Sequence, residues 1–167
     1  DLALESSDPR SGERTWAMLA QVAGRSGRGE KPGRALVQTY LAQHPLMQAL
    51  ARGDRDTYLE GEKRIRRMAG LPPQGRRPGL VISGTDANAT QRFARELALR
   101  APQADGIQVL GPAPAPIAMV RGRHRIRLLV KAKRDVNLQA YLGAWLKDVK
   151  PTGSLALQLD VDPYNFL

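Results

Sequence analysis

The sequence predicts two folded parts, an α/β segment over residues 1–74 and an α+β domain over residues 75–167. Apolar residues recur mainly at helical spacing in the first part, whereas strand-like and helix-like segments alternate in the second. Between them, Leu71-Pro72-Pro73-Gln74-Gly75 is a stiff connector that a helix cannot cross. We therefore place the boundary between the two parts after residue 74.

The first part is predicted to contain three helices and one short strand. One helix begins at Ser11 or Glu13 and stops at Gly24, and residues 34–40 then alternate as a strand. Two further helices run from Pro45 to about residue 70. They are separated at Gly53-Asp54, where Asp54 can cap the later helix.

The second part is predicted to follow the order β-α-β-β-α-β. This order suits a split sandwich, in which two helices cover one face of an antiparallel sheet. The expected segments are strand 80–84, helix 87–100, strand 107–110, a proline-rich turn 111–116, strand 117–133, a helix around 136–149 and strand 154–161.

Composition narrows the class of protein. With 42% hydrophobic and 25% charged residues, no leader and no apolar run near the ~18 residues of a membrane span, we expect a soluble cytoplasmic chain with no membrane partner. The absence of cysteine excludes disulfides, thiolate zinc sites and cysteine nucleophiles. His44 and His124 lack partners at ligand spacing, and Asp160 and Asp162 suit a solvated chain segment, so we expect no metal site.

The net charge of +10 favours a polyanionic partner. Residues 76–167 hold 14 Lys and Arg against 7 Asp and Glu, and residues 1–75 hold 12 against 9. The basic excess therefore lies mostly in the second part.

One motif suits phosphate chemistry. Residues 21–28 have the form Q-x-x-G-R-x-G-R, in which Gly24 and Gly27 permit backbone bends and Arg25 and Arg28 project as guanidinium forks. Two such forks can grip a phosphate and stabilise the charge of a transferring phosphoryl group. The alternative interpretation is a solvated basic turn.

This motif, led by Glu13-Arg14-Thr15, resembles motif VI in the second lobe of superfamily 2 helicases. Further stretches make the chain similar to one family, the primosomal protein N′ (PriA) replication-restart helicases. These stretches are residues 33–40, 44–46, 66–73, 109–116 and 160–163, and together they span nearly the whole chain.

The resemblance implies that residues 1–74 are the incomplete edge of a RecA-like second lobe. Gln21, Arg25 and Arg28 would then face ATP and Mg across the cleft between two lobes, with Gly24 and Gly27 shaping the loop. The chain contains no G-x-x-x-x-G-K-[ST] phosphate loop and no Asp-Glu-x-His motif. We therefore expect no ATP hydrolysis by this chain alone.

For the full-length protein, the resemblance implies an ATP-dependent helicase of three-prime-to-five-prime polarity. It would restart stalled forks at the nucleoid by assembling the primosome. The implied partners are branched or single-stranded DNA, single-strand-binding protein and primosome proteins. Family members bind zinc through cysteines that this chain lacks.

A row of cations marks the predicted strand 117–133. On a strand, every second side chain points to the same face, so basic residues at odd positions form a stripe. Such a stripe suits a phosphate backbone, an acidic protein tail or a solvated face, and the sequence leaves all three open. The candidate DNA-binding residues are Arg121, Arg123, Arg125, Arg127, Lys131 and Lys133.

Two other functional classes compete with a helicase part. The chain could act purely as a nucleic-acid- or protein-binding module, and the ATPase activity of the isolated chain, which we expect to be absent, is the discriminating measurement. An RNA helicase lobe would share motif VI but not the connector 71–73 or the segment 160–163.

Overall fold

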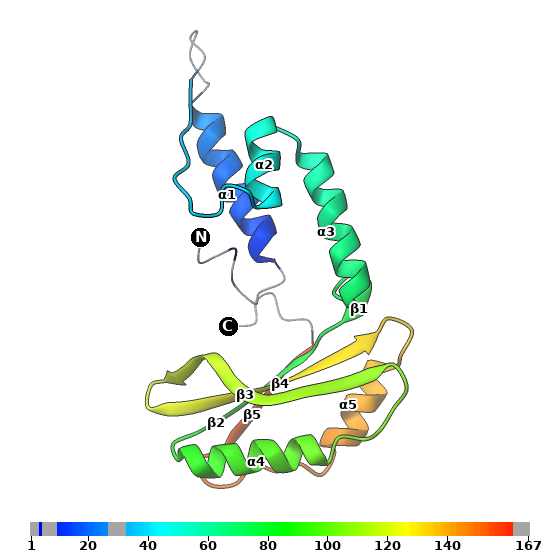
Figure 1. Ribbon diagram of the computed structural model, residues 1–167. Coiled ribbons are helices and arrows are strands. Elements are labelled where there is room, and N and C mark those ends of the chain that lie inside the picture. The colour runs from blue at the N-terminus through cyan, green and yellow to red at the C-terminus, as the bar shows by residue number, and fades with distance from the viewer. Residues whose placement is uncertain (1–3, 5–9, 27–32, 162–167) are drawn as a thin grey trace. The chain divides into compact units, whose positions relative to one another are not determined.

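A computed structural model describes residues 4, 10–26 and 33–161 (Figure 1). Contacts divide the chain into two compact units, Asp1–Ile65 and Arg66–Leu167. The connector belongs to the second unit, because the Gly75 N–H donates to the Leu71 carbonyl (3.2 Å) and residues 75–76 pair with another strand of that unit. The division therefore falls earlier than residue 74, within a helix.

Three helices account for the regular structure of the first unit: α1 (Ser11–Arg25), α2 (Pro45–Arg52) and α3 (Arg55–Ala69), the last of which continues into the second unit. The Trp16 and Tyr58 rings stack with centroids 5.2 Å apart and planes 9° apart. Leu46 and Ala49 of α2 complete this small buried core. The three helices predicted from the sequence are confirmed.

The α2–α3 junction follows from local capping. The Leu46 N–H donates to Nδ1 of His44 (3.2 Å), which makes His44 the N-cap of α2. Gly53 ends that helix at φ 69°, a conformation that favours glycine. Asp54 Oδ1 then accepts the Thr57 N–H (3.1 Å), as predicted.

The strand predicted over residues 34–40 is wrong. Residues 33–39 have no regular structure, and the side chains of Leu36 and Tyr40 are 97% and 100% exposed. A strand needs a neighbour to pair its N–H and C=O groups. Within the described part of the first unit there is no other strand to supply one.

The second unit is built on an open antiparallel sheet, which confirms the α+β class predicted for it. Strand β4 (Arg123–Lys133) lies between β3 (Ile107–Val120) and β2 (Gly79–Gly84), and β5 (Ala156–Asp160) pairs with β2. The short β1 (Gly75–Arg76) pairs with β4 in the same register as β2. The two form one interrupted strand, broken at Arg77-Pro78.

Helices α4 (Ala87–Leu99) and α5 (Leu138–Leu146) cover one face of this sheet (Figure 1). Their apolar side chains bury a single core with alternate residues of β2 and β4. The buried members of this core are Leu80, Ile82, Ala94, Leu97, Ile126, Leu128, Val130, Ala132, Leu138, Tyr141, Leu142 and Trp145.

The proline-rich turn over 111–116 and the unbroken strand over 117–133 are wrong. Residues 107–120 form one irregular strand, and Arg121-Gly122 turns it into β4. Both turn residues have positive φ, 49° and 73°, as two-residue hairpins require. Prolines are tolerated in β3 because it pairs with β4 alone and lies at the sheet edge.

Among the described residues, none of the helices combines the length and the apolar character needed to cross a lipid bilayer.

The Asp54 cap predicts a pH-dependent stability. Hydrogen bonds from Thr57 hold the pKa of Asp54 below its ordinary value of 3.8, with a smaller contribution from Arg52. Because this pKa is depressed, the contribution to stability is present at neutral pH and is lost as acid protonates the carboxylate. We expect Asp54→Ala to lower the melting temperature at about pH 7 and to lower it by a smaller amount at about pH 3.

Thermal unfolding followed by circular dichroism tests this expectation, with Asp54→Asn as the control. Asparagine caps a helix without a charge, so this variant should lack the pH dependence while keeping most of the stability. If Asp54→Ala lowered the melting temperature by the same amount at both pH values, the ionised Asp54 carboxylate would not be the stabilising cap.

Candidate nucleic-acid interface

Strand β4 carries apolar and basic residues on opposite faces. Ile126, Leu128 and Val130 are buried beneath α4 and α5. Side chains alternate between the two faces of a strand, so the odd-numbered residues belong to the face opposite the helices, here called the open face. The sequence-predicted residues in these positions are Arg123, Arg125, Arg127, Lys131 and Lys133.

Arg123 has a structural role. Its guanidinium donates to the Ser83 carbonyl oxygen (3.2 Å), to the Ser83 hydroxyl and to the Ser154 carbonyl oxygen. These contacts fasten the end of β2 to the loop that precedes β5. The guanidinium is therefore committed to contacts within the second unit.

Arg125 and Arg127 also contact other parts of the sheet. Arg125 Nη1 lies 3.5 Å from the Ile117 carbonyl oxygen of β3. Burial lowers the pKa of Arg77, and the positive charge of Arg127 lowers it further, which places these two cations near one another. The middle of the open face is thus crowded with partly buried arginines.

Lys131 and Lys133 border a hollow of about 280 Å³ at the end of the sheet near the connector. Glycines make room for their aliphatic stems: a Cβ at Gly70 would lie 3.2 Å from Lys131 Cε, and one at Gly106 would lie 3.0 Å from Lys133 Cδ. Gln74 and Gln108 also line the hollow. Ammonium and amide groups together suit an anionic group.

Arg121 does not lie on the predicted strand. It occupies the two-residue turn between β3 and β4, where its side chain is exposed. The predicted strand position was wrong because the basic alternation runs through the turn without a break, and a role for Arg121 in DNA binding stays a prediction. The following Gly122 was the available signal, since Gly is common in such turns.

The motif VI residues are only partly described. Gln21 and Arg25 are exposed and lie four residues apart on α1, hence on one side of the helix. Gly24 is helical, and a Cβ at this position would meet no other atom within 4 Å, whereas Gly27 and Arg28 lie outside the described residues. Whether these side chains act on a phosphate stays a prediction.

The sequence did not predict that position 33 requires glycine. A Cβ on Gly33 would lie 1.5 Å from the Ser26 carbonyl oxygen, so only glycine fits there. The two residues that flank the basic segment 27–32 therefore meet. A lone glycine in a Gly-rich stretch carries no signal for such an approach.

No cluster of three or more His, Cys, Asp or Glu side chains able to hold a metal ion occurs in the described part of the chain.

Comparison with known proteins identifies the family. The family model for the primosomal protein N C-terminal domain matches residues 67–164, which include the whole sheet. The chain belongs to the primosomal protein N (PriA) family. This confirms the resemblance found in the sequence.

Curated relatives align over essentially the whole chain. Replication restart protein PriA of Rickettsia conorii is 34% identical over 166 residues, covering 99% of this chain and 26% of the relative. The proteins of the same name from Synechocystis and Bacillus subtilis are 35% and 31% identical and are covered to 20% and 21% of their length. The chain thus spans a fifth to a quarter of the relatives that it matches.

The contacts of Arg123 predict a stability effect that its neighbours lack. We expect Arg123→Ala to destabilise the second unit by about 2 kcal/mol, because charged hydrogen bonds that join β2 to the loop before β5 are lost. Lys133→Ala removes an equal charge from an exposed side chain and should change stability little. Urea unfolding curves of the two variants compare these effects, and equal midpoints would contradict a structural role for Arg123.

Proposed function

We propose that the second unit binds branched or single-stranded DNA through its open face, as part of a longer replication-restart helicase. One observation carries the proposal: residues 107–133, the β3–β4 hairpin, contain six Lys and Arg and no Asp or Glu. A polyanion gains from contact with this hairpin, because the hairpin carries cations and has no carboxylate of its own to repel phosphates.

Binding of this kind depends on the phosphate backbone. Tyr141 and Trp145, the aromatic residues of α5, are buried under the sheet. Trp145 Nε1 donates to the Leu97 carbonyl oxygen (3.0 Å), and the Tyr141 hydroxyl donates to that of Pro102 (3.0 Å). They are therefore occupied in packing, which supports contact with phosphates in place of base stacking.

We further propose that the longer protein is an ATP-dependent helicase of three-prime-to-five-prime polarity that acts in primosome assembly in the bacterial cytoplasm. Gln21, Arg25 and Arg28 would contact the phosphates of ATP bound with Mg. The proposal is supported by family membership and by the exposure of Gln21 and Arg25 on one side of α1. The remaining ATP-binding groups would come from other parts of the protein.

A second candidate for the basic surface is an acidic protein tail, such as that of single-strand-binding protein. The hollow beside Lys131 and Lys133 favours it, because a carboxylate could sit between two ammonium groups and the amides of Gln74 and Gln108. DNA and the tail would then compete for the same lysines. The two candidates differ in whether extended phosphate contacts are needed.

The DNA proposal predicts a specific salt dependence. The association constant for fork DNA is measured between about 50 and 200 mM salt. We expect the double variant Lys131→Gln with Lys133→Gln to reduce the slope of log K against log salt by about 1.8, because each lost phosphate contact contributes about 0.9. Arg92→Gln with Arg95→Gln is the matched control, because both arginines are exposed on α4.

Equal slopes for the two double variants would show that only net charge matters. They would contradict the proposal that DNA binds through the open face. A peptide with an acidic tail and a free C-terminal carboxylate extends the experiment. If the peptide displaces the DNA while its amidated form does not, the hollow binds the tail.

The helicase proposal predicts that this chain by itself hydrolyses no ATP, with or without DNA. Phosphate release is measured beside an Arg25→Ala variant, which should give the same background. ATP hydrolysis that Arg25→Ala abolishes would contradict the need for other parts of the protein.

A further inference from the structure

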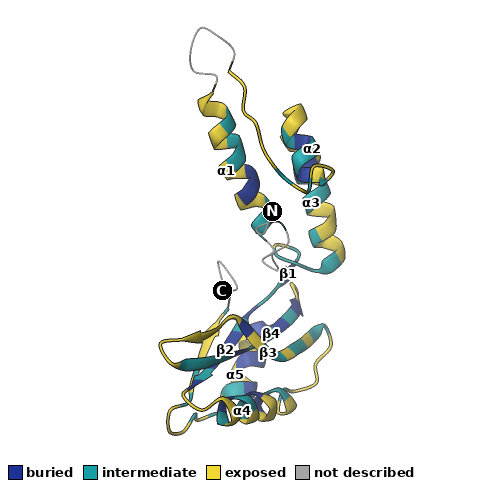
Figure 2. Cartoon of the chain, turned by 60° about the vertical axis from the view of Figure 1, so that its left-hand side comes forward, coloured by how far each residue is buried: buried dark blue, intermediate teal, exposed yellow. Residues whose placement is uncertain are grey.

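The free end of the β3–β4 hairpin combines exposed apolar side chains with cations. This hairpin tip, residues 116–122, is exposed at every position (Figure 2). Ile117, Met119 and Val120 are 49%, 53% and 38% exposed. An exposed apolar patch rimmed by polar or charged residues often marks a site of interaction with a partner.

The backbone explains how the tip is formed. Pro114 pairs with Ile126 and Met119 with His124, so β3 passes through four residues, 115–118, while β4 passes through Arg125 alone. The surplus residues form a bulge, which re-aims side chains at a sheet edge. Within this segment Ala115 is buried, whereas Ile117 is half exposed.

Cations surround the tip. Arg121 occupies the turn, and Arg125 reaches across to within 3.5 Å of the Ile117 carbonyl oxygen. The hairpin contains no carboxylate side chain at all. A partner must therefore offer an apolar surface and negative charge within a few ångströms of each other.

Nucleic acid offers this combination where base stacking is interrupted. Side chains such as Ile, Met and Pro can insert between base steps while neighbouring cations hold the phosphates. Insertion costs least where bases are already unpaired or unstacked. The junction of a branched molecule supplies such a step, whereas a continuous duplex does not.

We propose that the hairpin tip is a wedge that packs Ile117 and Met119 against the exposed base step at a DNA branch point. The inference rests on the DNA binding proposed above and assigns the recognition of structure to the tip. The open face then supplies affinity for phosphates, and the apolar tip supplies the preference for a branch.

Two double variants test the wedge. Ile117→Ser with Met119→Ser removes the apolar tip, and Met68→Ser with Leu99→Ser is the control, because Met68 and Leu99 are 83% and 87% exposed in the same unit outside the hairpin. Each protein is titrated with a fork and with a continuous duplex of equal length. A 2-aminopurine base beside the fork junction reports unstacking.

We expect the wild-type chain and the control to bind the fork several-fold more tightly than the duplex and to raise 2-aminopurine fluorescence. The tip variant should bind the two DNAs equally, leave the fluorescence unchanged and retain the wild-type salt slope. A fork preference or fluorescence rise that survives in the tip variant overturns the wedge.

Other outcomes separate this inference from the function on which it rests. If the wild-type chain binds neither DNA, the proposed DNA binding itself fails. If it binds fork and duplex equally with a steep salt dependence, only the wedge fails. If the tip variant loses binding to phosphatidylserine vesicles and keeps its fork preference, the tip meets a membrane surface and the wedge is again rejected.

Discussion

The second unit depends on the two-sided character of one strand. β4 pairs with β3 along one edge and with β1 and β2 along the other, so most of the sheet is hydrogen-bonded to it. Its even positions from Ile126 to Ala132 fill the core beneath α4 and α5, and all its odd positions except Leu129 carry cations. A shift of register by one residue would bury arginines and expose the core, so packing fixes the position of the charges.

Sequence periodicity predicted most of the fold, because local chemistry fixed the relevant elements. Gly53 and Asp54 specify where α2 ends and α3 begins. The alternation of β4 likewise depends only on its own residues. The family resemblance rested on short stretches spread through the chain, which the match over residues 67–164 confirms in large part.

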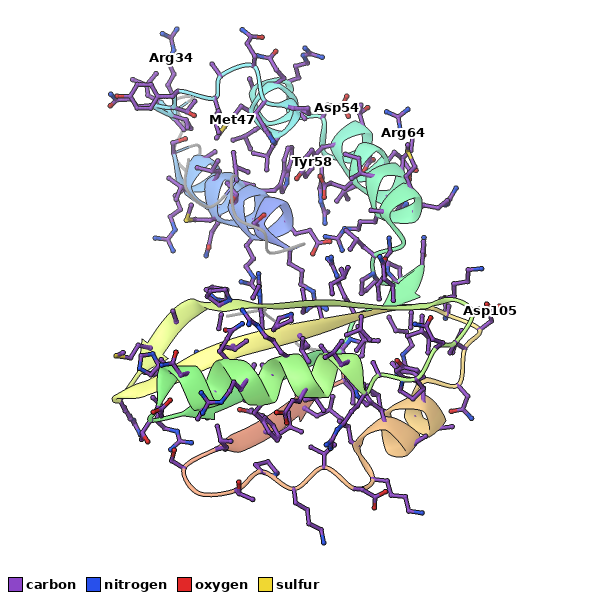
Figure 3. The ribbon with its side chains drawn as sticks, turned by 60° about the horizontal axis from the view of Figure 1, so that its bottom comes forward. Arg34, Met47, Asp54, Tyr58, Arg64 and Asp105 are labelled. Atoms are coloured by element: carbon purple, nitrogen blue, oxygen red, sulfur yellow. The ribbon has the colours of Figure 1, made fainter. Side chains whose placement is uncertain are left out.

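The failures arose where structure depends on distant partners. The alternation of residues 34–40 indicated a strand, but pairing requires a neighbour that no local pattern reveals. The prolines at 112, 114 and 116 predicted a turn, yet an edge position lets a strand accept them. Arg121 was placed on the cationic row because the turn preserves the alternation. The hollow beside Lys131 could not be predicted because Gly70 and Gly106, which border it, come from distant stretches of the chain. Figure 3 labels Asp105, the residue that precedes Gly106 in the loop before β3.

The closeness of Arg77 and Arg127 bears on the stability of the second unit. Burial lowers the pKa of Arg77, and repulsion by the positive charge of Arg127 lowers it further. The apolar core on the other face of the sheet offsets that local electrostatic cost, so the stability gained on one face of β4 keeps like charges close together on the other.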